Sequence, residues 1–204
     1  DGWGLVIFDL NGFNGGSALA ANGDAGAALI ATHLSAASAG LVWALIEYQR
    51  FKRASMIGLV TGVVAGLATV TPASGFVGPI GGVILGACGS VVCYQAVELV
   101  KHRLKVDDSL DVFAVHGVGG ILGTLLVAFL AAPVVGGVGY APGVGLGGQF
   151  LTQVIGVASV CAWSAIASLA IVFVIDKTMR LRAAPEAIEE GLDLSAHGER
   201  AYNP

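Results

Sequence analysis

The sequence predicts an all-α integral membrane protein with six transmembrane helices. Of its 204 residues, 55% are hydrophobic and only 12% are charged, and the mean hydropathy is +0.81. A soluble domain usually carries about 25% charged residues, so this composition excludes a globular surface exposed to water. The apolar segments are continuous and lack the period-two alternation of a membrane β-barrel, so the predicted spans are helices.

Six apolar segments reach or approach the roughly 20 residues that a helix needs to cross a bilayer. They lie near residues 4–21, 25–46, 55–71, 77–97, 112–132 and 150–175. Residues 1–175 are therefore predicted to form the transmembrane domain. Residues 176–204 are polar and acidic, and they are predicted to form a cytoplasmic C-terminal tail.

The basic residues predict the orientation of these segments. Nine of the ten Lys and Arg residues follow the second, fourth and sixth segments, and the tenth, Arg200, lies in the same tail. The alternate loops, residues 22–24, 72–76 and 133–149, contain none. By the positive-inside rule, the basic loops face the cytoplasm. Both ends of this chain are therefore predicted to be cytoplasmic.

Glycines recur at the spacing that brings membrane helices into close contact. One row contains Gly58, Gly62 and Gly66, another contains Gly78, Gly82 and Gly86, and a shorter one contains Gly119 and Gly123. Because glycine has no side chain, such rows let helix backbones approach closely. The sequence therefore predicts a compact helical bundle.

One histidine, His116, lies within an uncharged, glycine-rich apolar stretch, residues 112–123. An ionisable side chain at membrane depth is costly, so such a residue usually lines a pathway or a site. A structural, hydrogen-bonded histidine is the alternative interpretation. His33 also lies within a predicted span, but no comparable motif surrounds it, and we expect it to pack or to make hydrogen bonds.

Three motifs resemble those of the ammonium transporter family, the Amt/Rhesus group. Residues 11–18 resemble its GFN-x-GSA segment, residues 107–120 resemble its DD-xx-DVF-x-VHG-x-GG segment, and residues 190–202 resemble its EGLD-xx-xHGE-xAY ending. Their order and spacing match as well. The family has eleven spanning helices, which form two inverted five-helix repeats and one extra long helix. The resemblance implies that the six spans here correspond to helices six to eleven.

The first repeat is absent from this chain, which begins with Asp1 rather than Met. We therefore expect the N-terminal half to be supplied by the same polypeptide or by a separate chain. The resemblance also implies a homotrimer with one pore per protomer, and control by a cytoplasmic PII-type protein.

The function that the resemblance implies is the passage of ammonium or ammonia across the lipid bilayer. A bare ammonium ion in a low-dielectric pore pays a large desolvation penalty. The family mechanism is deprotonation of the ion, followed by passage of neutral ammonia through a hydrophobic lumen. By resemblance, His116 is the second of two paired pore histidines. A neutral imidazole offers one donor and one acceptor, which suits it to relaying a proton.

The resemblance gives roles to two more residues. Phe13 is implied to be a pore-gating phenylalanine, and Ser17 an outer-vestibule hydroxyl that helps to hold the cation. The two lie four residues apart, hence on one helix face. For Phe13, ordinary helix packing is the alternative. Asp111 lies at the start of the fifth segment, where a carboxylate can cap a helix, and we expect it to be structural.

Two rival functions remain open at this point. The family usually has aromatic residues and glycine just before GFN, whereas this chain has Asp9 and Asn11 there. A carboxylate at that depth needs a partner or water. This departure favours a non-conducting structural half-transporter in a larger membrane complex, and an ammonium sensor is a further alternative. Without any redox, hydrolytic or phosphate-binding constellation, we expect no enzymatic activity, cofactor, metal or nucleic-acid partner.

Overall fold

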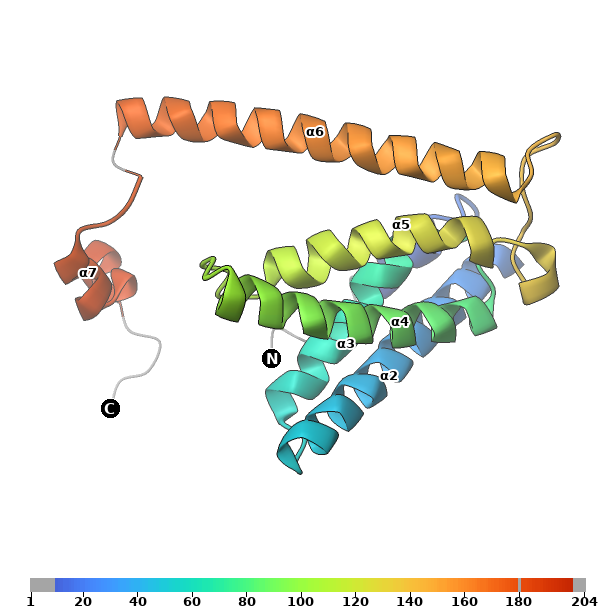
Figure 1. The fold of residues 1–204 in the computed structure, drawn as a ribbon, viewed down its shortest axis with the longest axis horizontal. Helices are drawn as coiled ribbons and strands as arrows, with labels where there is room; N and C mark the ends of the chain where they lie inside the picture. The colour runs from blue at the N-terminus through green and yellow to red at the C-terminus, as the bar shows by residue number, and fades with distance from the viewer. Residues whose placement is uncertain (1–9, 180, 200–204) are drawn as a thin grey trace. The chain divides into compact units, whose positions relative to one another are not determined.

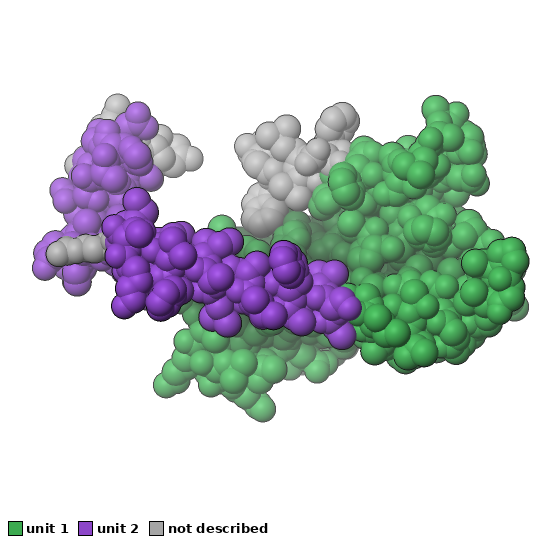
Figure 2. Space-filling view, turned by 90° about the horizontal axis from the view of Figure 1, so that it is seen from above, with its two compact units in different colours: residues 1–157 green, residues 158–204 purple. Residues whose placement is uncertain are grey.

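The computed structural model describes residues 10–179 and 181–199 (Figure 1). The described residues are helical or irregular, and no strand occurs among them. Clustering of backbone contacts divides the chain into two compact units, residues 1–157 and residues 158–204, which Figure 2 shows in different colours. The boundary between the units falls within one long helix.

Five helices of the described chain are long and apolar enough to cross a membrane. They cover Gly23–Phe51, Met56–Ala73, Pro79–Arg103, Val112–Leu130 and Leu146–Thr178. The segment predicted near residues 4–21 lies partly on residues 1–9, which are outside the described residues. Within the described part, residues 10–16 are helical, and turns and bends follow up to residue 22.

Most of these spans combine an α-helix with a short turn of different pitch. The elements are α2 (Gly23–Phe51), α3 (Met56–Val70), η1 (Thr71–Ala73), α4 (Pro79–Val97), η2 (Glu98–Arg103), η3 (Val112–Gly117), α5 (Val118–Leu130), η4 (Pro133–Val135) and α6 (Leu146–Thr178). Both η2 and η3 are π-helical, whereas η1 and η4 are 3₁₀ turns. Helices α2 to α5 form the bundle of the first unit (Figure 1).

Helix α2 is longer than the apolar segment predicted near residues 25–46. It begins after Asn22, whose side-chain oxygen accepts bonds from the backbone N–H groups of Asp24 and Ala25 at 3.0 and 3.2 Å. It ends at Lys52, which adopts a left-handed conformation with φ 59°. The helix therefore continues past the apolar segment, because backbone hydrogen bonding does not stop where hydropathy falls.

The start of α3 is fixed by an acidic side chain from α2. Glu47 accepts hydrogen bonds from the backbone N–H of Ser55 at 2.7 Å and from its hydroxyl at 3.1 Å. The Ser55 hydroxyl oxygen in turn accepts the N–H of Gly58 at 2.8 Å, as an N-cap does. A methyl group added at Gly58 would collide with the Glu47 carboxylate, which would then have to move from this position.

Five of the six glycines in the two longer rows pack on α2, whereas Gly78 approaches the backbone of Gly136. A methyl group added at Gly66 of α3 would lie 2.5 Å from the carbonyl oxygen of Ser35, and one at Gly86 of α4 would collide with the same oxygen. The Ser35 hydroxyl donates to the Gly66 carbonyl at 2.8 Å. One stretch of α2 thus contacts α3 and α4 at once. We call this three-helix contact the glycine interface; it consists of Ser35, Gly66 and Gly86. The prediction of tight backbone contact is confirmed.

The shorter row packs α5 on α3. A methyl group at Gly123 would collide with the carbonyl oxygen of Thr69, and one at Gly119 would lie 3.1 Å from the hydroxyl of the same threonine. Leu67, Val70 and Leu85 are fully buried nearby in the described bundle. The interior of the first unit is therefore built from backbone contacts with a few aliphatic side chains between them.

The second unit contains the C-terminal part of α6 and the tail. Within the tail, Pro185–Glu190 forms α7, and Asp193–His197 forms the π-helical turn η5. Helix α6 extends beyond the predicted residues 150–175 at both ends. The tail therefore contains two short helical elements that its polar composition did not indicate.

Candidate functional site

His116 lies in a wide helical turn rather than in a regular α-helix. Residues Val112–Gly117 form η3, and the α-helical pattern begins only at Val118. Such π-turns are rare and occur often at functional sites. The His116 side chain is exposed on this chain, and the structure gives its ring no hydrogen-bond partner among the described residues. The adjacent Phe113 is also exposed, at 60%.

The backbone of this turn is held by Asp108. Its carboxylate accepts the N–H groups of Val112 at 2.8 Å, Phe113 at 3.0 Å and Ala114 at 3.1 Å. These amides begin the helix and would otherwise lack a partner, and a carboxylate also complements the positive end of the helix dipole. The sequence analysis did not single out Asp108. The available signal was a second acidic residue a few positions before the predicted span.

The cap that we expected from the Asp111 carboxylate is not made. Asp111 occupies the N-cap position, but its side chain forms no cap hydrogen bond. Its Oδ1 lies 2.8 Å from Lys101 Nζ in an ion pair. The backbone of Asp111 adopts a left-handed conformation with φ 57°, which folds the chain back so that Asp108 reaches the amides. Asp108 therefore supplies the cap that we expected from Asp111.

The other side of the turn contacts α4 and α3. The thiol of Cys93, which is fully buried, lies 3.6 Å from the carbonyl oxygen of Val115, next to His116. A methyl group at Gly119 would lie 3.1 Å from Thr69 Oγ1 and 3.2 Å from Cys93 Sγ. The backbone on both sides of His116 is therefore fixed by neighbours, while its ring is left exposed.

Phe13 and Ser17 belong to the first described helical segment, residues 10–16, and the turn that follows it. Both side chains are exposed, Phe13 at 66%, and the Ser17 hydroxyl donates to the Phe13 carbonyl at 3.4 Å. This bond joins the Ser17 side chain to the backbone of the residue four positions before it.

Asn14 anchors this segment to the bundle, and the sequence analysis missed its role. It is fully buried, and its Nδ2 donates to the hydroxyls of Thr32 at 3.2 Å and Thr71 at 3.4 Å. Its backbone carbonyl accepts the hydroxyl of Ser74 at 2.9 Å. Thr71 follows α3, the helix that also packs on Gly119, so the end of α3 contacts both the Phe13 segment and the His116 helix.

The sequence analysis also considered His33, Asp9 and Asn11. His33 is exposed on α2. Asp9 lies outside the described residues, and Asn11 is partly buried. Among the described residues, no group of three or more His, Cys, Asp or Glu side chains could hold a metal ion.

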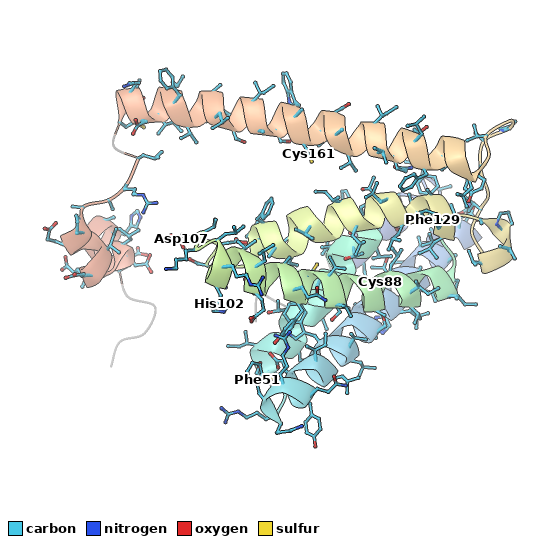
Figure 3. All side chains as sticks on the ribbon, viewed as in Figure 1. Phe51, Cys88, His102, Asp107, Phe129 and Cys161 are labelled. Carbon is cyan, nitrogen blue, oxygen red and sulfur yellow. The ribbon has the colours of Figure 1, made fainter. Side chains whose placement is uncertain are left out.

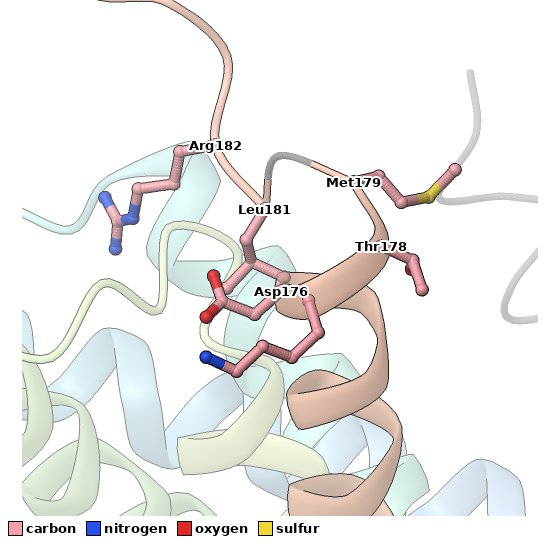
Figure 4. Close-up of a pocket in the computed structure, with 6 residues that line it drawn as sticks. Asp176, Thr178, Met179, Leu181 and Arg182 are labelled. Carbon is pink, nitrogen blue, oxygen red and sulfur yellow. The ribbon is translucent and has the colours of Figure 1, made fainter.

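An open pocket at the end of α6 contains none of the predicted site residues. Figure 4 shows its lining within the second unit: Asp176, Lys177, Thr178, Met179, Leu181 and Arg182. These side chains are polar or flexible and surround a shallow hollow at a helix end. This pocket is therefore not the transport site that the sequence indicates.

Comparison with known proteins identifies the family. The model of the Ammonium Transporter Family matches residues 2–202. An ammonium transporter of Aquifex aeolicus is 43% identical over 204 residues, which cover 99% of this chain and 47% of that protein. Ammonium transporter Amt1 of Archaeoglobus fulgidus is 43% identical over 97% of this chain and 50% of its own length. The chain thus spans about half the length of the curated relatives that it matches.

Solved structures agree with the sequence matches. A structure described as a sensor Amt protein has a TM-score of 0.87 at 32% identity, over 96% of this chain and 48% of its own. The crystal structure of Saccharomyces cerevisiae Mep2 has a TM-score of 0.81 at 32% identity, over 91% of this chain and 44% of its own. The fold is that of a helical, multi-pass membrane protein. The chain belongs to the ammonium transporter family.

Proposed function

We propose that the protein containing this chain moves ammonium or ammonia across a lipid bilayer, and that this chain supplies one half of the pore. The observation that carries the proposal is the His116 turn, whose backbone is fixed by Asp108 on one side and by Cys93 and Thr69 on the other. A fixed backbone with an exposed imidazole suits a residue that meets a partner from outside the chain.

In this proposal, His116 handles the proton. A neutral imidazole can accept a proton at one nitrogen while it donates at the other, so it relays a proton without a lasting charge in an apolar lumen. The ammonium ion is relieved of its charge before it enters the low-dielectric region, where an unpaired ion is most costly. Phe13 gates the lumen with its exposed ring, and Ser17 contributes a hydroxyl to the outer cation site.

The proposed architecture is six spans, in residues 1–175, followed by the tail, residues 176–204. The first five spans form the second of two inverted repeats, and the sixth is the long final helix of an eleven-helix protein. The first repeat, on the same or a separate chain, brings the first of the two paired pore histidines. The basic loops face the cytoplasm by the positive-inside rule, and with them both ends of the chain.

The proposed partners are those of the family. We propose a homotrimer with one pore in each protomer, and a cytoplasmic PII-type protein that docks near the tail and the basic loops. The concentration of Lys and Arg in three loops, with the acidic tail, supports a charged docking surface on that side.

The test is ammonium flux into liposomes that contain the full-length protein. Loss of a group that transfers protons typically slows the reaction by about 10²–10⁴-fold, so His116→Ala is expected to lose at least about tenfold of the flux. His33→Ala is the matched control, because His33 is also an exposed histidine on a spanning helix, and its flux is expected to stay within about twofold of wild type.

The other outcomes separate the rival functions. A wild-type protein that neither binds nor moves ammonium would leave only the structural subunit. Binding of ammonium without flux would indicate the sensor. Flux that is unchanged in His116→Ala would remove the proposed pore role of this histidine.

A further inference from the structure

One stretch of the chain, the end of α4 together with η2, contacts the His116 turn at several points. Figure 3 labels His102 within η2 and Asp107 in the loop that follows, where the chain turns back toward η3. This loop, residues 104–111, is short, so a side chain of η2 can reach the start of η3. The contacts lie at the beginning, in the middle and near the end of the turn.

The contact at the beginning is made by Lys101 of η2. Its Nζ lies 2.8 Å from Asp111 Oδ1, an atom shielded from solvent, and donates a hydrogen bond to the carbonyl of Ser109 at 3.3 Å. Asp111 is the residue whose left-handed backbone lets Asp108 reach the amides of the turn. Residues other than glycine seldom adopt this conformation, which persists only where the surroundings hold it. The two contacts of Lys101 supply such support.

The other two contacts are apolar or weakly polar. Ala96 and Val100 form a buried cluster with Ala114, in the middle of the turn. Further back along α4, the fully buried thiol of Cys93 donates to the carbonyl oxygen of Val115 at 3.6 Å. The end of α4 and η2 therefore hold the turn by an ion pair, by side-chain packing and by a weak S–H···O hydrogen bond.

The position of the His116 ring depends on this backbone. The ring has no hydrogen-bond partner among the described residues, so its place is set by the turn that carries it. The carbonyl that Cys93 contacts belongs to the peptide group that joins Val115 to His116. A displacement of about 1 Å at a reacting group can slow a reaction about 10²-fold. Loss of support for the turn is therefore expected to slow proton transfer more than it lowers stability.

We propose that Lys101 and Cys93 are positioning residues for proton transfer at His116. Lys101 acts through the left-handed backbone of Asp111, and Cys93 acts through the carbonyl of Val115. This role rests on the proposed function of His116, and neither side chain acts on the substrate directly. The end of α4 thus sets the geometry of the proton relay on α5.

The main experiment measures ammonium flux into liposomes per amount of folded full-length protein. Lys101→Gln is expected to lower the maximal flux about threefold or more and to leave the half-saturating ammonium concentration unchanged, because positioning affects transfer rather than binding. The matched control is Lys105→Gln in the same loop, since Lys105 makes no ion pair among the described residues. Its flux is expected to stay within about twofold of wild type.

Rescue separates positioning from a loss of folded protein. Lys101→Arg keeps the charge and is expected to retain most of the flux. Exchanging the two charges, in the double variant Lys101→Asp and Asp111→Lys, is expected to recover about half of the flux or more, and this arm decides if Lys101→Gln does not fold. Flux that is equally low in Lys101→Arg and Lys101→Gln, or equal in Lys101→Gln and Lys105→Gln, would overturn the role of Lys101.

A second series tests the thiol. Cys93→Ala removes the donor to the Val115 carbonyl, whereas Cys93→Ser keeps a donor at the same place, so we expect lower flux per folded protein in Cys93→Ala and recovery in Cys93→Ser. Cys88→Ala, at an exposed position of the same helix, is the control. Equal flux in Cys93→Ala and Cys93→Ser would overturn the role of the thiol.

Hydrogen exchange of the amides of residues 112–117 gives a readout that does not depend on transport. Lys101→Gln is expected to speed this exchange about two- to fivefold, as loss of a partly exposed ion pair does, while Lys105→Gln leaves it unchanged. Faster exchange in a protein whose wild type moves no ammonium would refute the proposed function and keep the support of the turn by Lys101. Unchanged exchange in Lys101→Gln would refute the positioning role, even where wild type conducts.

Discussion

The glycine interface and the turn that carries His116 are held together in different ways. At Ser35, Gly66 and Gly86, three helices meet through backbone atoms, and hydrogen bonds from the hydroxyls of Ser35 and Ser38 to backbone carbonyls accompany the contact. Around His116, three amides converge on one carboxylate, and the ring itself stays exposed. Close backbone packing thus fixes the bundle at the glycine interface, whereas the Asp108 carboxylate fixes the short turn before His116 and leaves the side chains of that turn open to an external partner.

The largest effect is expected from filling the glycine interface. In Gly86→Val, the new side chain would collide with the Ser35 carbonyl and the Ser38 hydroxyl, both on α2. Overpacking of a close contact costs about 1–3 kcal/mol or more, so the thermal stability of the purified protein should fall strongly or the protein should not be recovered.

The control for this variant is Gly26→Val, also in a membrane helix. A methyl group at Gly26 meets nothing within 4 Å in the structure, so its stability should stay close to that of wild type. Equal melting temperatures for Gly86→Val and Gly26→Val would show that the backbone contact does not limit the fold.

The second effect concerns the polar anchor. Asp108→Ala removes the acceptor of three amides, and loss of a helix cap costs about 1–2 kcal/mol. Because the cap fixes the turn before His116, we expect ammonium flux to fall by a larger factor than the fraction of folded protein. Asp107→Ala is the matched control, since among the described residues Asp107 accepts a hydrogen bond only from the Ser109 hydroxyl. If Asp108→Ala lowers the melting temperature but leaves the ammonium flux unchanged, the cap is not needed for conduction.

The third effect tests whether the Phe13 segment is anchored like the scaffold or like the turn. Asn14→Ala removes two hydrogen bonds but also a buried Oδ1 that meets no donor among the described residues, so a net loss of about 1 kcal/mol is expected. A double-mutant cycle with Thr32→Val should give a coupling of about 0.5 kcal/mol or more. Additive losses in the two single variants would mean that the Asn14–Thr32 hydrogen bond does not hold the segment. Ser17→Ala, at an exposed position, should leave the stability nearly unchanged.

The smallest effect is expected at Asp111. Asp111→Asn breaks a partly exposed ion pair with Lys101, which is typically worth about 0.2–1 kcal/mol and is screened by salt. Its effect on chemical denaturation should therefore shrink as sodium chloride is added. A loss as large as that of Asp108→Ala would contradict the assignment of the cap to Asp108.

Five of the predicted spans and their close contacts could be predicted from the sequence because both depend on local properties, whereas the segment near residues 4–21 lies partly outside the described residues. Hydropathy gave residues 55–71 for a helix that is observed at Met56–Val70, and the glycine spacing indicated which faces approach other helices. The end of α2 was missed, since its polar last turn is helical for reasons of hydrogen bonding rather than hydropathy.

The contacts of the site were less accessible to sequence reasoning. Three aspartates, Asp107, Asp108 and Asp111, precede the His116 turn, and the left-handed backbone of Asp111 decides which one reaches the amides. Asn14 finds its partners 18 and 57 residues away, in helices that only the folded bundle brings together. Residue spacing reports neighbours along one helix, and it carries no information on such pairs.

The π-helical turn that carries His116, at the start of α5, departs from regular α-helical geometry. A π-turn contains one residue more than the same length of α-helix, and each residue of an α-helix rotates the chain by about 100°. Deleting one residue between Val112 and His116 would thus leave a more regular span, equally able to cross the bilayer, with its upstream part rotated by more than a quarter of a circle. The shortened helix would still cross the membrane, but the residues before the deletion would face a different side.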